Sequence, residues 1–188
     1  NLATFQGIDW GYEHPQVFIK VAYDRDRDKL YILHETYRQR TKLLAFLKAT
    51  ARTNRKLDEE LLRQHMRDET IADRDPNKNA DARDYGWNII GATKKWKGGG
   101  RDYSWEWLQE VGEIIVNPAV TPNVAKELRT LEHEIVKSTG EYSSKYPDLG
   151  EDGVMAMAYA LNRVIMDYKR ASDYNDYEFA DDEDDFDD

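Results

Sequence analysis

The amino-acid sequence predicts a mixed α/β fold, with a central sheet that is flanked by helices. Three runs at 4–11, 16–23 and 29–37 are rich in β-branched and aromatic residues, which is typical of strands. Further along the chain, short strand patterns alternate with helical patterns, which indicates strands that are connected through helices. We therefore expect a sheet that is antiparallel at its start and parallel later.

The expected elements are separated by polar segments, prolines and glycines. The segment "DRDRD" at 24–28 joins the second and third strands as a hairpin. A helical region at 41–69 follows, with an interruption expected near "RTNRK". The later elements are shorter: a strand at 69–73, a helical turn at 79–86, a strand at 87–93, a glycine-rich loop at 94–101, a helix at 102–112, a strand at 113–120 and a helix at 121–136 that Thr121 can cap.

The last helix is expected from about Gly150 to Arg170, and in the stretch "KYPDLGEDGVMAMAYALNRV" at 145–164 two acids stand directly before its apolar run. The run from Val154 to Leu161 has no polar face, so this helix should be buried. Glu151 and Asp152 at its start are therefore either helix caps or charges that are held at a site.

The net charge of −10 comes from one end of the chain. Residues 171–188 contain ten acids and no lysine or arginine, so that removing them from the 37 acids leaves 27 against 27 basic residues. We expect residues 1–170 to form one domain and residues 171–188 to be a disordered acidic tail, because like charges repel and little apolar area is available. The neutral body remains compatible with a nucleic-acid partner.

Several kinds of site are excluded by composition. The chain has no cysteine, which excludes disulfides and thiolate metal sites. No segment approaches the ~20 continuous apolar residues of a membrane span, so no membrane partner is expected. The pattern "GxxxxGK[ST]" is also missing, which excludes ATP binding through a phosphate loop.

Three acids are expected where sheet architecture brings side chains together. Asp9 ends the first strand, Asp73 ends the strand "TIAD", and Asp152 begins the buried helix. Ligand crevices of open α/β sheets lie at such strand ends. Gathered carboxylates repel unless a hard cation such as Mg²⁺ neutralises them. From the residues alone, caps and surface charges remain the alternative interpretation.

The motifs "GIDWG", "ADRDP" and "GEDGVMAMAYAL", in this order, resemble those of the nuclease domain of the large terminase subunit of tailed bacteriophages. The segments "NIIGATKKWKGGG" and "TPNVAKELRTLEHEIVKSTGEYSSKYPDLGEDG" are similar to the intervening parts of the same family. The resemblance covers roughly residues 5–165. It implies an RNase H-like fold and metal-dependent cleavage of double-stranded viral DNA concatemers during genome packaging.

The resemblance also implies roles for the acids. Asp9 would bridge two Mg²⁺ or Mn²⁺ ions, Asp73 would hold one of them, and Asp152 the other. Asp75 and Glu151 would be auxiliary ligands. The choice between Asp152 and Glu151 as the main third ligand stays open, because Gly150 and Asp152 stand where other members often have histidine.

The basic residues around the glycine-rich loop are candidates for contact with DNA. Lys94 follows an expected strand and could reach the scissile phosphate. Lys95, Lys97 and Arg101 could hold the phosphate backbone, which requires charge more than fixed geometry.

The resemblance further implies four partners and a location: double-stranded DNA, the terminase ATPase domain, the portal protein and the small terminase subunit, in the host bacterial cytoplasm and transiently at the procapsid portal. Two alternatives stay open. One keeps the fold but makes the protein a resolvase or transposase. The other is a docking module that holds DNA or the portal without cutting.

Overall fold

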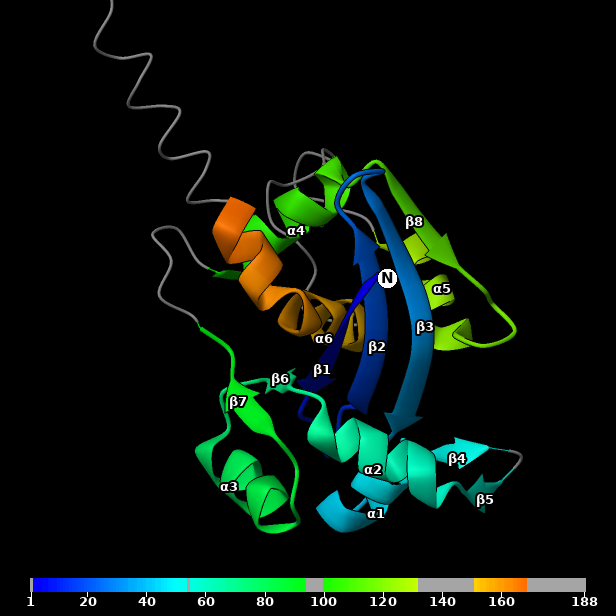
Figure 1. The fold of residues 1–188 in the computed structure, drawn as a ribbon, viewed down its shortest axis with the longest axis vertical. Helices are drawn as coiled ribbons and strands as arrows, with labels where there is room; N and C mark the ends of the chain where they lie inside the picture. Colours follow the sequence, from blue (N-terminus) through cyan, green and yellow to red (C-terminus); the bar gives the residue numbers. More distant parts are fainter. Residues whose placement is uncertain (1, 54, 94–99, 132–150, 169–188) are drawn as a thin grey trace, which may run out of the picture.

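The computed structural model describes residues 2–53, 55–93, 100–131 and 151–168. Six strands form one sheet in the order β7-β6-β1-β2-β3-β8 (Figure 1). Strands β1, β2 and β3 pair antiparallel, and β6, β7 and β8 pair parallel with their neighbours, which confirms the predicted mixed sheet. The strands are β1 (Ala3–Asp9), β2 (Gln16–Asp24), β3 (Lys29–Arg38), β6 (Thr70–Ala72), β7 (Ile89–Gly91) and β8 (Glu113–Val116).

Helices cover both faces of this sheet, and each face has its own hydrophobic core. One core packs α4, α5 and α6 against side chains of β2 and β3. The other packs α1, α2 and α3 around Ile8 and Phe18. The helices are α1 (Leu43–Ala49), α2 (Glu59–Arg67), α3 (Pro76–Asp84), α4 (Gly100–Glu110), α5 (Pro122–Thr130) and α6 (Asp152–Ala160).

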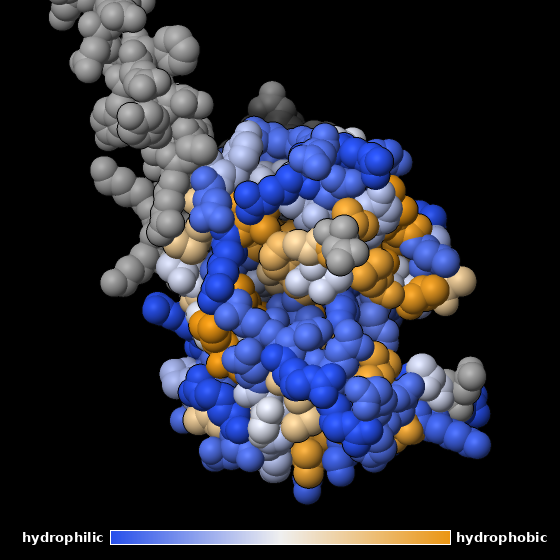
Figure 2. Space-filling model, in the orientation of Figure 1, coloured by the Kyte–Doolittle hydropathy of each residue, from blue (hydrophilic) through white to orange (hydrophobic). Residues whose placement is uncertain are grey.

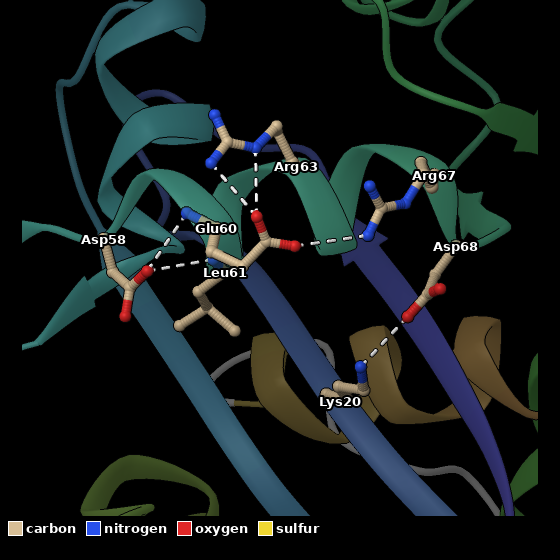
Figure 3. Close-up of polar contacts among 7 residues, drawn as sticks. All are labelled: Lys20, Asp58, Glu60, Leu61, Arg63, Arg67 and Asp68. Atoms are coloured by element: carbon tan, nitrogen blue, oxygen red, sulfur yellow. Dashed lines mark hydrogen bonds and ion pairs between the residues drawn. The ribbon is translucent and has the colours of Figure 1, made fainter.

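The predicted interruption between the first two helices is a small β-hairpin. Strands β4 (Arg52–Thr53) and β5 (Lys56–Leu57) pair antiparallel, and Arg55 in the turn has a φ of 66°. Helix α2 then begins after its N-cap residue Asp58, whose carboxylate accepts hydrogen bonds from the N–H groups of Glu60 and Leu61 (Figure 3). Such a cap satisfies donors that the helix itself leaves unpaired.

Two predicted helix starts differ from the structure. The helical turn expected at 79–86 begins earlier, at Pro76, because proline is well tolerated in the first turn and Asp75 caps the helix. Thr121 does not cap α5; its hydroxyl donates to the carbonyl of Asn117 instead. Glu35 on β3 accepts the first N–H groups of α5 in its place, at 2.9 Å from both Asn123 and Val124.

The buried helix predicted from the apolar run is confirmed. Helix α6 lies across β1 and β2, and every residue from Ala156 to Ala158 is buried (Figure 1). It approaches β1 closely at Gly7, where an added Cβ would lie 2.0 Å from the carbonyl oxygen of Ala156. A glycine in the strand and alanines in the helix therefore permit this contact.

The polar surface is consistent with the high share of charged residues in the sequence. Figure 2 shows that one face of the molecule is mostly hydrophilic, with apolar side chains in small scattered groups. Within the described part of the chain, no helix has the length and apolar content to cross a membrane.

Candidate active site

Asp9 and Asp73 lie side by side at the carboxyl ends of two parallel strands. Ile8 of β1 is in register with Ala72 of β6, and the N–H of Asp73 donates to the carbonyl of Ile8 at 2.9 Å. Each acid is the next residue along its strand, so the pairing itself places the two on neighbouring positions. Both side chains are half-buried. The structure thus brings together the first two predicted ligands.

A buried asparagine fixes the backbone beside both acids. The indole N–H of Trp10, which follows Asp9, donates to Asn79 Oδ1 at 2.8 Å. Asn79 Nδ2 in turn donates to the carbonyl of Asp73 at 3.0 Å. Sequence reasoning missed Asn79, because the helix after the second acid has no hydrophobic side that would mark an inward-facing position.

Replacement of Asn79 by alanine should loosen this link. We expect a loss of about 2 kcal/mol in the free energy of unfolding, because two hydrogen bonds of a buried group disappear. Urea denaturation would measure it. Asn77→Ala is the matched control on the exposed side of the same helix, and equal losses for the two variants would contradict the linking role.

The start of α6 reaches the same edge of the sheet. Asp9 pairs with Val17 of β2, and Val17 pairs with Tyr37 of β3, so these residues form one row across three strands. Gly153 in the first turn of α6 lies over that row, since an added Cβ would meet the hydroxyl of Tyr37. Asp152, directly before Gly153, therefore begins its helix at the level of the row that contains Asp9.

The first N–H groups of α6 are capped by a residue from another helix. Glu151 occupies the N-cap position without a side-chain capping hydrogen bond. Glu127 of α5 does this instead: its Oε2 accepts from the N–H groups of Gly153 at 2.9 Å and Val154 at 3.0 Å. The capping of α6 therefore does not depend on the side chain of Glu151, and a role of Glu151 and Asp152 at a site stays a prediction.

Glu127 was missed by sequence reasoning. It lies in the predicted helix at 121–136, and its signal was a single acid among residues that face inward, three positions after Val124. Its other oxygen, Oε1, accepts a hydrogen bond from the hydroxyl of Tyr37. A sequence pattern cannot show which helix a glutamate caps.

Burial dominates the electrostatics of this group of side chains. It raises the pKa of the Glu127 carboxyl to about 7, against the opposing effect of the hydrogen bond from Tyr37. It also raises the pKa of Asp152, while the nearby charge of His14 acts in the opposite direction. The pKa of the Tyr37 hydroxyl is raised by burial and by the charge of Glu127. Bringing a cation to this site would offset the cost of burying negative charge.

Helix α6 also contacts the second strand-end acid. The hydroxyl of Tyr159, two turns after Asp152, donates to Asp73 Oδ1 at 3.0 Å. One helix therefore carries the last pair of acids and a hydrogen bond to Asp73, so its position affects both parts of the site.

The structure describes the side chains of only some of the remaining predicted site residues. Asp75 caps α3 by accepting from the N–H groups of Asn77 and Lys78, and also lies 3.7 Å from the Lys78 ammonium. Glu151 is buried at the start of α6. Lys94, Lys95 and Lys97 lie outside the described residues, as does the side chain of Arg101 in α4.

The acids share one edge of the sheet but do not form a closed ligand cluster. Across residues 2–53, 55–93, 100–131 and 151–168, no group of three or more His, Asp or Glu side chains is arranged to hold a metal ion. The donor chemistry nevertheless fits a hard divalent cation, because all five candidate ligands are carboxylates. The ligand assignments stay predictions.

Comparisons with known proteins agree with the predicted resemblance. No protein-family model matches the chain. The large terminase subunit of Bacillus phage SPP1 is 29% identical over 164 residues, which cover 84% of this chain and 35% of that protein. The chain therefore spans about a third of the length of this curated relative.

Solved structures of large terminase nuclease domains share the fold. The nuclease domain of g2p, the large terminase of bacteriophage SPP1, with bound Mn, has a TM-score of 0.71 at 24% identity and covers 86% of both chains. The P22 large terminase nuclease domain has a TM-score of 0.62 at 15% identity, over 85% of this chain and 80% of that one. The predicted RNase H-like fold is confirmed, with large terminase nuclease domains as its structural neighbours.

Proposed function

We propose that this chain is a divalent-metal-dependent endonuclease that cleaves double-stranded viral DNA concatemers during genome packaging, as the nuclease domain of a large terminase subunit. The observation that carries the proposal is the placement of Asp9, Asp73 and the start of α6 at one edge of the sheet, in the fold of such nuclease domains. The Mn-bound state of the SPP1 domain supports the metal dependence.

The proposed site works through carboxylates that hold the cations. Two Mg²⁺ or Mn²⁺ ions would supply an activated water and stabilise the leaving oxygen of the phosphodiester. Asp9 would bridge the ions, Asp73 would hold one and Asp152 the other, with Glu151 and Asp75 as auxiliary residues. Burial raises the pKa of the Asp152 carboxyl, and a bound cation would offset the cost of its buried charge.

The proposal extends to partners and location. Lys94 would approach the scissile phosphate, and Lys95, Lys97 and Arg101 would hold the DNA backbone. The terminase ATPase domain, the portal protein and the small subunit are the proposed protein partners, in the host bacterial cytoplasm. Residues 1–170 would form the nuclease domain.

A plasmid-nicking assay with Mn²⁺ tests the proposed activity. We expect the parent chain to cut, and Asp73→Asn and Asp152→Asn to cut at least about 100-fold more slowly, because ligand loss should exceed the loss of an outer partner. Asp81→Asn changes an exposed acid on α3 and serves as the control. Circular dichroism would verify that each variant folds.

Two results would count against the proposal. Unchanged cutting by both variants would show that the site assignment is wrong. DNA binding by the parent without cutting under any divalent ion would favour the docking module instead.

Deletion of residues 171–188 should tighten DNA binding at low salt, because ten negative charges are removed from the chain. Fluorescence anisotropy with a double-stranded oligonucleotide across a salt titration would measure this. The effect should fade as salt screens the repulsion. Identical binding curves for the two chains would show that the tail does not affect the DNA site.

A further inference from the structure

The beginning of α6 presents buried backbone donors that need a partner. The first N–H groups of any helix lack acceptors within the helix. Here the N–H groups of Gly153 and Val154 are buried, and one oxygen of Glu127 accepts both. Glu127 comes from α5, 26 residues earlier than Gly153, so this cap joins two helices rather than two turns of one.

Both oxygens of Glu127 are engaged. Oε2 accepts from the two backbone donors, and Oε1 accepts from the Tyr37 hydroxyl. A carboxylate with this set of partners is a structural acceptor, and not an open ligand for a cation. Tyr37 lies on β3 in the row that contains Asp9, so the hydrogen bonds link the sheet, α5 and α6 in one chain of contacts.

The space around the cap is filled. A Cβ added to Gly153 would lie 1.9 Å from the Tyr37 hydroxyl, 2.8 Å from Val124 Cγ2 and 2.9 Å from Glu127 Oε2. The first turn of α6 therefore fits in one position, which is defined by side chains of β3 and α5. A shift of this turn would break the cap or collide with Tyr37.

We propose that Glu127 is a positioning residue of the active site. Its buried carboxylate holds the first turn of α6 in place and thereby positions the side chains of Asp152 and Glu151. This inference rests on the proposed function. The two capped amides directly follow Asp152, so the cap determines the position of the backbone that carries the Asp152 carboxylate. Displacement of a catalytic group by about 1 Å is enough to cost a large factor in rate.

Two substitutions at Glu127 separate capping from charge. Glu127→Leu removes the acceptors and keeps an apolar volume in the same place. Glu127→Gln keeps one oxygen for the two N–H groups and offers its amide N–H to the Tyr37 oxygen. Asp58→Ala is the matched control, because it removes the cap of α2 on the opposite face of the sheet.

Two measurements are made without DNA. Hydrogen exchange at the amides of Gly153 and Val154 should become about fivefold faster or more in Glu127→Leu, as expected for the loss of a helix cap. Calorimetry should show about tenfold weaker Mn²⁺ binding for the same variant. Glu127→Gln should stay close to the parent in both, and Asp58→Ala should leave both unchanged. Plasmid nicking should follow the Mn²⁺ affinity.

The outcomes distinguish this inference from the proposed function. If the parent neither binds Mn²⁺ nor cuts, the proposed function fails, whatever the amide exchange shows. If the parent does both, unchanged exchange or unchanged Mn²⁺ affinity in Glu127→Leu overturns the positioning role, as does a Glu127→Gln variant that is equally defective. If Glu127→Leu does not fold, Tyr37→Phe removes one partner of Glu127 and should show the same changes to a smaller extent; parent-like values would again overturn it.

Discussion

Gly7→Ala should lower the free energy of unfolding by about 3 kcal/mol or more, the upper range for forcing extra volume into a packed core. The added Cβ would lie 2.0 Å from the carbonyl oxygen of Ala156 and 2.5 Å from the amide nitrogen of Ala160. Both are backbone atoms of α6, so no side-chain rotation relieves the overlap. The helix has to move away from β1, which opens the core beneath it.

Urea denaturation would measure this effect. Gly91→Ala is the control, because Gly91 also lies in a strand of the same sheet, and its added Cβ would meet only Asn79 and Arg74 atoms at 3.5 and 3.8 Å. Equal losses for the two variants would show that the close contact between Gly7 and α6 is not the cause of the destabilisation. If Gly7→Ala folds, it should also cut poorly, since Asp9 is two residues further along β1.

The second large effect concerns pH and a buried histidine on the other face of the sheet. His65 of α2 is buried, with its ring centre 4.9 Å from that of Phe18 and 5.8 Å from that of His34. Burial lowers the pKa of His65 to about 4, and the charges of His34 and Lys20 act in the same direction, against Asp68. Burial likewise lowers the pKa of His34.

The direction of the pH effect on stability follows from the protonation of His65 in the unfolded and folded chains. The unfolded chain takes up a proton on His65 near pH 6.5, whereas the folded chain resists it until about pH 4. Stability from the neutral ring is therefore present above pH 6.5 and is lost as pH falls toward 4, by roughly 2 kcal/mol at pH 5. The titration of Glu127 has the opposite effect on the free energy of unfolding. Its pKa is raised to about 7 in the folded chain, so the stability that its protonated form contributes is lost as pH rises through 7.

Because His65 and Glu127 titrate with opposite effects on stability, the contribution of His65 is measured as the difference between a His65 variant and the parent. Between pH 7.5 and pH 5, the stability of His65→Leu relative to the parent should shift by about 2 kcal/mol in favour of the variant, since the leucine has no proton to take up. Urea denaturation at the two pH values gives this difference. Gln64→Leu, at an exposed and uncharged residue of the same helix, should follow the parent. A constant gap between His65→Leu and the parent would contradict the account.

Local patterns predicted most of the elements. The β-branched runs became β1, β2 and β3, and the apolar run became the buried helix α6, because strand and helix periodicity depends on neighbouring residues. The hairpin β4–β5 was not predicted, since a two-residue pairing leaves little pattern in the sequence.

The sequence by itself determined that acids stand at strand ends and at the mouth of a buried helix, because position along an element is a local property. Only the tertiary structure decided which groups support them. The register of β1 and β6 put Asp9 beside Asp73, and a glutamate from α5 took over the capping that Glu151 could have supplied. Such contacts join segments far apart in the chain, and they form only when packing brings buried donors to the nearest acceptor.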